Sequence, residues 1–217
     1  MDYAHRAGDF SLESNICYRI GRVCLHHGQP RQALAWFARG QLAAQRSRSS
    51  LAAAVLDANQ AWAYAMMANA TQATTLLGRA HDHLAQANLA QAPDWARFFT
   101  PTDLYAMIGT VHTELSAGDP RHASTAIEAL GRALAGYVDS MNRSQAFTLT
   151  MLATSHLRHG DLDYGIGIGH HALALARQVA SQRVTDRMTP LQHQTRRHTT
   201  HTDAQELSYL IGQHRKC

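Results

Sequence analysis

Hydrophobic residues follow a helical spacing along most of the chain, and short polar breaks interrupt them. The stretch GRVCLHHGQPRQALAWF, residues 21–37, has one helical pattern, a break over residues 28–30 and a second helical pattern directly afterwards. Alternation of apolar and polar residues never extends far enough to predict a strand. The sequence therefore predicts an all-α protein made of antiparallel helical hairpins.

The same hairpin pattern recurs along the chain. The first helices of its copies are anchored at Ile20-Gly21, Gln60-Ala61, Ile108-Gly109 and Leu152-Ala153, which are 40, 48 and 44 residues apart. One hairpin cannot bury its apolar face alone, whereas several stacked side by side form a continuous core. We therefore expect about four degenerate repeats followed by a capping helix.

Small residues are placed where the two helices of each hairpin would cross closely. In the first helices they are Gly21, Ala61, Gly109 and Ala153, and in the second helices Ala33, Ala73, Ala126 and Gly165. A large residue four positions later (Phe37, Leu77 or Leu130) is predicted to fill the gap against the next hairpin, and Gly169 replaces it in the fourth copy.

Turn residues support the boundaries of the predicted helices. Asn69, Asp119 and Asp161 are candidate N-caps. Pro30 and Pro120 fit the first helical turn, where a missing N–H costs nothing.

This arrangement resembles the tetratricopeptide repeat (TPR), a helix-turn-helix unit of about 34 residues. The first copy is the most similar, with Ile20-Gly21, Ala33 and Phe37 in place, whereas Cys17 and Cys24 stand at the tryptophan and tyrosine positions of the family. The resemblance covers roughly residues 12–180. It implies a TPR-like superhelix over residues 1–182, followed by a basic C-terminal segment with a capping helix over residues 183–217.

A second resemblance concerns three stretches of the chain. APDWARFFTPTDLYAMIGTVHTEL, RSQAFTLTMLATSHLRHGDLDYGIGIGHHALALA and RVTDRMTPL resemble the C-terminal repeat half of bacterial helix-turn-helix transcriptional regulators. In that family a DNA-reading domain precedes the repeats, which act in regulation and protein contact. The resemblance implies the regulatory part of such a protein without its DNA-binding domain, so that DNA would be reached only through a missing or separate helix-turn-helix domain.

Charge distribution and cysteine content argue against a nucleic-acid-binding protein and against a secreted, disulfide-stabilised protein. Residues 1–176 carry 13 basic and 13 acidic side chains, whereas residues 177–217 carry 7 and 3, so the net charge of +4 belongs to the C-terminal segment. The neutral remainder argues against a nucleic-acid surface. Three cysteines do not form a disulfide framework, and neither a signal peptide nor an apolar stretch of membrane-spanning length is present. We therefore expect a cytoplasmic protein with no membrane contact.

The sequence contains no clear motif for catalysis, cofactor binding or metal binding. GIGIG, residues 165–169, fails the dinucleotide-binding spacing because residue 170 is histidine and no strand precedes it, so tight helix packing explains it better. The fifteen histidines lack the spacing of zinc sites, although His156 and His159 share a helix face. No hydrolase or phosphate-loop motif occurs. The sequence predicts no catalytic residue, no metal site and no cofactor.

Two segments stand apart from the repeats. APDWARFFTPTD, residues 92–103, is either a docking loop or, as we favour, an insertion whose aromatic residues plug a gap between unequal repeats; Thr100 or Thr102 is expected to cap the next helix. In the C-terminal segment we expect a short helix that breaks at Pro190, a mobile polar linker QHQTRRHTTHT, and a capping helix from about Asp203 to Ile211.

A stacked array would leave a concave groove lined by the first helix of each hairpin. By analogy with the TPR geometry, the partner-binding positions are Tyr18, Arg22, His26, Asn59, Trp62, Met66, Thr110, Glu114, Thr154 and Arg158. Their mixture of polar and aromatic side chains suits a protein or peptide segment better than a phosphate backbone.

The leading hypothesis is therefore a non-enzymatic protein-protein interaction module. The alternative is a sensor that binds a signalling peptide or small ligand. A metal-dependent enzyme is a remote third hypothesis, kept because of the number of histidines.

Overall fold

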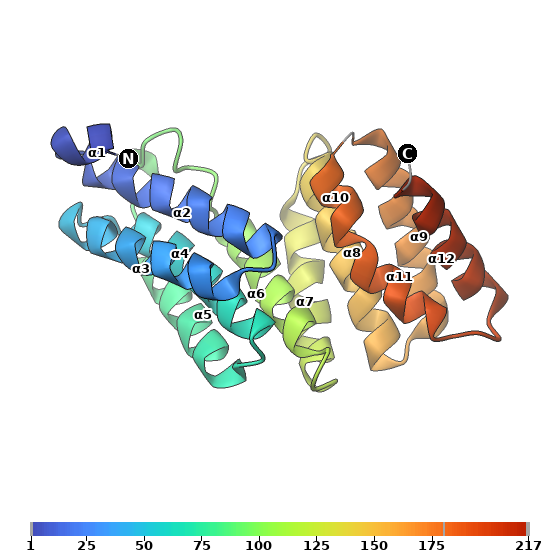
Figure 1. Ribbon diagram of the computed structural model, residues 1–217. Coiled ribbons are helices and arrows are strands. Elements are labelled where there is room, and N and C mark those ends of the chain that lie inside the picture. The colour runs from blue at the N-terminus through green and yellow to red at the C-terminus, as the bar shows by residue number, and fades with distance from the viewer. Residues whose placement is uncertain (1, 180, 216–217) are drawn as a thin grey trace. The chain divides into compact units, whose positions relative to one another are not determined.

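The protein consists of helices joined by turns and short connections. The computed structural model describes residues 2–179 and 181–215, and contains no strand within them. Helices occupy α1 Asp2–Arg6, α2 Phe10–His26, α3 Pro30–Arg46, α4 Ser50–Met66, α5 Ala70–Ala85, the 3-10 turn η1 Leu89–Gln91, α6 Pro101–Leu115, α7 His122–Gly136, α8 Asn142–His159, α9 Leu162–Gln178, α10 Gln182–Arg187, α11 Thr189–Arg196 and α12 Thr202–His214. Figure 1 shows them in chain order, and the all-α prediction is confirmed.

The helices form two compact units, Met1–Met107 and Ile108–Cys217. In the first unit, α2 pairs with α3 and α4 pairs with α5, and α4 also contacts both α2 and α3. In the second unit, α8 pairs with α9 and α7 lies against α8. Within the described residues, no helix is both long and apolar enough to span a bilayer.

Glycine at the helix crossings has a direct steric cause. A methyl group at Gly21 would overlap the ring of Phe37, and one at Gly109 would overlap the side chain of Leu130. Phe37 and Leu130 are both fully buried. Phe37 and Leu130 therefore pack against the first helix of their own hairpins. Leu130 also shares a hydrophobic cluster with Leu152 of the next hairpin, as the sequence pattern predicts.

A second set of glycines admits side chains from the following hairpin. A Cβ at Gly40 would lie 2.9 Å from Leu56 Cδ2, and one at Gly169 would lie 2.5 Å from Leu207 Cδ2. This contact explains why the fourth copy carries Gly169 where the pattern calls for a large residue. Leu207, from the end of the chain, occupies the space.

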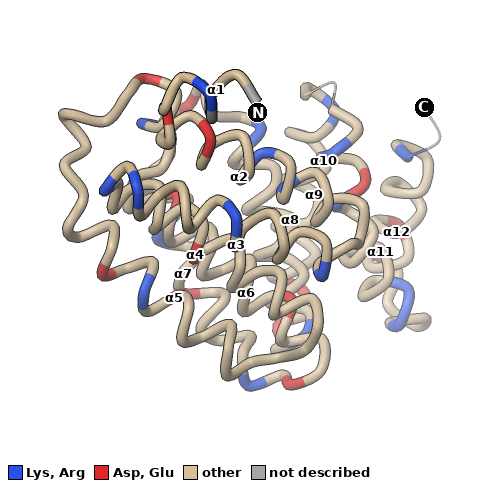
Figure 2. Tube along the Cα trace, turned by 60° about the vertical axis from the view of Figure 1, so that its left-hand side comes forward, with Lys and Arg blue, Asp and Glu red and all other residues tan. Residues whose placement is uncertain are grey.

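The C-terminal segment belongs to the core of the second unit. Helix α11 lies on α8 and pairs with α12, which lies on α9. Its buried residues share one hydrophobic cluster with α8 and α9: Val184, Met188, Leu191, Ala204, Leu207 and Ile211. Figure 2 shows the arginines of this segment separated between α10, the end of α11 and the C-terminal end.

The expectation of a mobile polar linker in this segment is wrong for its first half. Residues 189–196 are helical, and Gln192, Gln194 and Thr195 are buried. Gln192 Nε2 donates to the Ser208 carbonyl at 2.9 Å, and its Oε1 accepts from Arg215 at 3.0 Å. Polar side chains are buried here because their hydrogen bonds are satisfied within the unit. Pro190 stands in the first turn of α11, where it starts a helix.

The predicted helix starts are partly confirmed. The Asn69 side chain accepts from Gln72 N at 3.1 Å and caps α5, and Pro30 is the first residue of α3. Asp161 stands at the N-cap of α9 without a capping hydrogen bond from its side chain. Helix α7 begins only at His122, with Arg121 at its N-cap, so Asp119 and Pro120 precede it as part of the turn.

Thr100 caps α6, as one of the two predicted candidates. Its hydroxyl accepts from Asp103 N at 3.4 Å, and the Asp103 carboxylate accepts from Thr100 N at 3.0 Å. The two residues form a reciprocal capping pair that fixes where the long connection ends and the helix begins.

Alanine substitutions at two helical glycines should have opposite effects. Gly21→Ala should lower the free energy of unfolding by about 1–3 kcal/mol, because the added methyl group overlaps the buried Phe37 ring. Gly78→Ala on α5 should raise it by roughly 0.5–1 kcal/mol, because open space surrounds that glycine and alanine is the better helix former. Urea denaturation of both variants checks this, and two changes of the same sign would contradict the packing described.

Candidate interaction faces

The first unit brings several predicted groove residues together. Arg22, on α2, donates from Nη1 to Asn59 Oδ1 on α4 at 3.1 Å. Its guanidinium also lies over the Trp62 ring, 5.0 Å from the centroid, an attractive cation–π geometry. His26, one turn further along α2, meets Trp62 edge-on at 5.8 Å between centroids. These four side chains bind α2 to α4.

Burial divides these residues into two layers. Asn59 and Trp62 are each only 2 % exposed, and Asn59 Nδ2 donates to the Val55 carbonyl at 2.6 Å. Tyr18, Arg22, His26 and Met66 are half-buried. Asn59 and Trp62 therefore support the face from beneath, and the half-buried side chains stand above them. That a partner contacts these positions stays a prediction.

The segment of residues 92–99 lies on the same face. The Phe98 ring stacks on Tyr18, with centroids 5.6 Å apart and planes inclined by 18°. Arg97 Nε donates back to the Ala92 carbonyl at 2.8 Å and holds the segment in a compact turn. Phe99 is 3 % exposed, as expected of a plug, whereas Trp95 and Phe98 keep 36 % and 41 % of their surface exposed. The segment thus buries the Phe99 ring in the core and leaves the Trp95 and Phe98 rings partly exposed to solvent.

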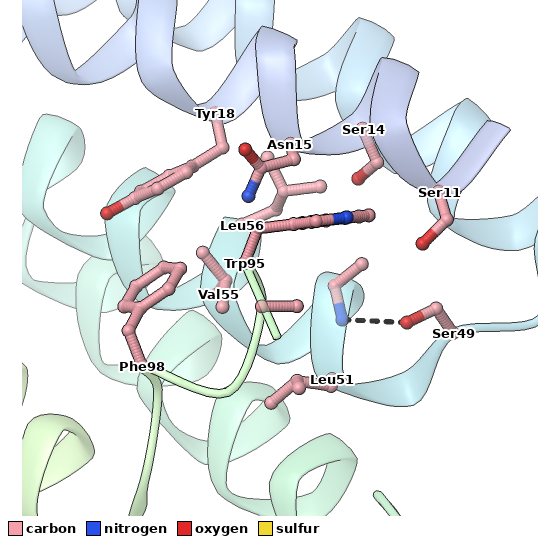
Figure 3. A pocket seen from close by; sticks show the side chains of 12 residues that line it. Ser11, Ser14, Asn15, Tyr18, Ser49, Leu51, Val55, Leu56, Trp95 and Phe98 are labelled. Atoms are coloured by element: carbon pink, nitrogen blue, oxygen red, sulfur yellow. Dashed lines mark hydrogen bonds between the residues drawn. The ribbon is translucent and has the colours of Figure 1, made fainter. Parts of the chain in front are cut away.

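An open pocket adjoins these two rings. It holds about 320 Å³ of space, including solvent at its mouth. In Figure 3 the Trp95 indole lies between polar residues of α2 on one side and apolar residues of α4 on the other, with Tyr18 and Phe98 at one end. Its lining consists of Ser11, Ser14, Asn15, Tyr18, Ser49, Leu51, Ala52, Val55, Leu56, Trp95, Ala96 and Phe98.

Sequence reasoning missed most of this pocket. Residues 11, 14 and 15 occupy the same α2 face as Tyr18, at helical spacings of seven, four and three residues. Continuing the face from Tyr18 towards the N-terminus would have found them. Residues 95–98 belong to a connection without regular structure, so no periodicity places them there.

The second unit holds the other predicted positions. Thr110 is 7 % exposed and its hydroxyl donates to Met151 Sδ at 3.3 Å; Thr154 is 1 % exposed and donates to the Thr150 carbonyl at 2.8 Å. Glu114 is half-buried. Both threonines are thus oriented by contacts inside the unit.

Arg158 is the most constrained of the predicted positions in this unit. Its Nη1 donates to the Thr113 carbonyl and to Ser116 Oγ, the latter at 3.0 Å. Its Nε is buried and meets no hydrogen-bond partner among the described residues. Burial lowers the pKa of Arg158, whereas the charge of Glu114 acts to raise it. Arg158 therefore links α8 to α6 from a half-buried position.

The structure brings two histidines of the second unit together. His112 Nδ1 and His122 Nδ1 lie 3.0 Å apart across the α6–α7 turn. Nowhere in the described residues do three histidine, cysteine, aspartate or glutamate side chains converge as metal ligands would. Cys17 and Cys24 form no disulfide, and burial raises the pKa of the Cys17 thiol.

Comparison with known proteins defines the class of fold. Neither a family model nor a curated protein matches the chain. A crystal structure from Podosopora anserina, described as a kinesin light chain with nearly identical TPR-like repeats, is 15 % identical and matches with a TM-score of 0.57 over 91 % of this chain and 92 % of that chain. A single-substitution variant of that protein matches with a TM-score of 0.58 at 14 % identity over the same shares of each chain.

The fold is therefore an all-α, TPR-like array of antiparallel helical hairpins. Because the sequence identity to these structures is only 14–15 %, the similarity supports a conclusion about the fold and not about function. The expected resemblance to the TPR is confirmed at that level.

The histidine pair predicts an acid-sensitive fold. Burial, with a smaller contribution from His122, lowers the pKa of His112 from its ordinary 6.5 to about 4, so the folded state favours the neutral ring. Because unfolding lets His112 take up a proton, stability should fall as the pH drops from about 6.5 towards 4. His112→Gln should reduce the difference in Tm between pH 7.5 and pH 5, measured by circular dichroism.

His171→Gln, at an exposed position of α9, is the matched control and should leave that difference unchanged. Equal pH dependence in the wild type and the His112 variant would contradict the assignment.

Proposed function

We propose that the protein is a non-enzymatic protein-interaction module, and that it binds an extended peptide segment of a protein partner on the face shared by α2 and α4. One observation carries the proposal. The chain's own segment 92–99 already lies on this face, with Phe98 stacked on Tyr18. A face that accommodates the aromatic side chains of a turn of its own chain has the chemistry to accommodate aromatic side chains of a partner.

The composition of the face supports a peptide ligand. Extended peptides bind through a few apolar anchors together with hydrogen bonds to polar groups. The face offers both: the exposed rings of Trp95 and Phe98, and the hydroxyl and amide groups of Ser11 and Asn15 beside them. Arg22 adds a positive charge whose direction is fixed by Asn59.

The burial of Cys17 supports the proposal of a non-enzymatic role. Cys17 is fully buried, and that burial raises its pKa, which disfavours the reactive thiolate. Asp57, which is also fully buried, accepts a hydrogen bond from Gln41 Nε2, and its carboxylate lies 2.8 Å from His83 Nδ1. Its pKa is raised, with burial as the main cause. This network joins α3, α4 and α5, and so serves the packing of the hairpins.

The narrower proposal is that the chain is the regulatory part of a bacterial transcriptional regulator and acts in the cytoplasm. Its support is the resemblance of residues 92–115, 143–176 and 183–191 to the repeat half of those regulators, together with the absence of a disulfide between Cys17 and Cys24.

The genomic sequence upstream of Met1 tests this narrower proposal. An in-frame helix-turn-helix segment would support the proposal. If none is found and no DNA-binding protein co-purifies with the chain, this narrower role is excluded.

Selection from a random peptide library displayed on phage tests the interaction module itself. The full chain should enrich peptides, and Tyr18→Ala should weaken the binding of the selected peptides roughly tenfold, the effect of losing one well-packed aromatic contact. Isothermal titration calorimetry measures the Kd. Leu42→Ala is the matched control, because Leu42 is 61 % exposed on α3 in the same unit; it should change the Kd less than about twofold.

If no peptide is enriched, or if both substitutions weaken binding equally, the α2/α4 face is not the interaction face. Circular dichroism spectra of the variants show that a loss of binding is not a loss of fold.

A further inference from the structure

The aromatic turn (residues 93–98) carries its polar contacts within its own stretch of the chain. The Arg97 guanidinium pairs with Asp94 at 3.0 Å and donates from Nε to the Ala92 carbonyl at 2.8 Å. Among the described residues, no hydrogen bond or ion pair joins the aromatic turn to α2 or α4. Its polar contacts therefore do not depend on its position on the face that these two helices share.

Two partly exposed rings attach the aromatic turn to that face. The Trp95 indole lies between the α2 and α4 walls of the pocket, and the Phe98 ring stacks on Tyr18 (Figure 3). Trp95 keeps 36 % and Phe98 keeps 41 % of its surface exposed, whereas the adjacent Phe99 is 3 % exposed and belongs to the core. Because the burial of the two rings is incomplete, removing them from the face costs less free energy than extracting a core side chain.

The Trp95 indole already fills the pocket between α2 and α4. The space enclosed beside it, without the open solvent at its mouth, is about the size of one water molecule. The apolar floor of the pocket comes from Leu51, Val55 and Leu56. An aromatic side chain from another molecule therefore reaches this floor only by replacing Trp95.

Contacts on both sides keep the aromatic turn close to the face. On its N-terminal side, Ala92 N donates to the Leu89 carbonyl at 3.3 Å. On its C-terminal side, Phe99 is buried and the Thr100–Asp103 pair caps α6. A group held by such short connections competes for its site at an effective concentration in the millimolar range. A shallow contact is therefore enough to keep the face covered until a segment that binds more tightly displaces the two rings.

We infer that the aromatic turn is an autoinhibitory contact: Trp95 and Phe98 occupy the α2/α4 face until aromatic side chains of the partner segment replace them. The exposed surfaces of the two rings meet the partner first, and Tyr18 and the apolar floor then receive the partner's rings. The inference rests on the proposed function, because it describes the binding face before the partner is bound. The affinity of the wild type is lowered in proportion to the fraction of molecules in which the face is open.

The chain's own segment, supplied as a separate peptide, tests this competition. The probe is a blocked, fluorescein-labelled peptide with the sequence of residues 92–100, APDWARFFT. The double variant Trp95→Ala/Phe98→Ala of the full chain should bind this peptide roughly tenfold more tightly than the wild type does, because the competing rings are gone. Fluorescence polarisation measures the Kd.

Matched controls locate the binding on the face. A peptide that itself carries Trp95→Ala and Phe98→Ala should bind neither the wild type nor the double variant. Adding Tyr18→Ala to the double variant should weaken its binding of the original peptide roughly tenfold, because the ring on which Phe98 stacks is lost. Leu42→Ala, at an exposed position of α3, should bind the peptide as the wild type does.

Circular dichroism establishes which variants are folded. If the double variant is not, Phe98→Ala alone takes its place. This single variant removes the ring that stacks on Tyr18, keeps Trp95, and should still bind the peptide more tightly than the wild type, by a smaller factor. Equal Kd values for the wild type and the folded variant would overturn the inference.

Peptides from the phage library separate this inference from the proposed function. Peptides selected on the wild type should bind the double variant roughly tenfold more tightly, because no internal rings compete with them. If they bind both proteins equally, the inference fails while the interaction module stands. If neither protein enriches any library peptide, the proposed function fails and the inference fails with it.

Discussion

The contact of a large buried side chain with the backbone of a glycine on the facing helix is the constraint on which the structure depends. At Gly21 and Gly109 it brings the two helices of a hairpin together over Phe37 and Leu130. Any side chain larger than hydrogen would separate the helices and open a void in a core packed at crystal-like density. The glycines lower intrinsic helix stability, but the packing that they permit more than offsets that cost.

The same constraint explains how the stack ends. Each hairpin leaves an apolar surface that the next must cover, so the last one needs a cover of its own. In the second unit, α11 and α12 cover α8 and α9, and Leu207 enters the space above Gly169. A basic, polar-looking segment therefore contributes to the core, because most of its apolar residues are buried and the buried Gln192 side chain is hydrogen-bonded.

Close packing of α2 and α4 also determines the proposed binding face. Asn59 and Trp62 are buried beneath Arg22 on the face shared by α2 and α4. The Arg22 guanidinium is therefore already engaged, by a hydrogen bond to Asn59 and a cation–π contact with Trp62. The remaining neutral surface lies further along α2, where Tyr18 meets the connection after α5. Among the described residues that line the pocket at this place, none carries a charge.

The sequence by itself determined the helical hairpins, their repetition and the small residues at their crossings, because periodicity and turn chemistry are local properties of a chain. It also located Tyr18 and Arg22 on one helix face. Only the tertiary structure decided that Trp62 lies beneath that face, that residues 192–196 are packed as a helix, and that Phe98 stacks on Tyr18. These three outcomes depend on contacts between residues distant along the chain, and no local pattern encodes which side chain will cover which surface.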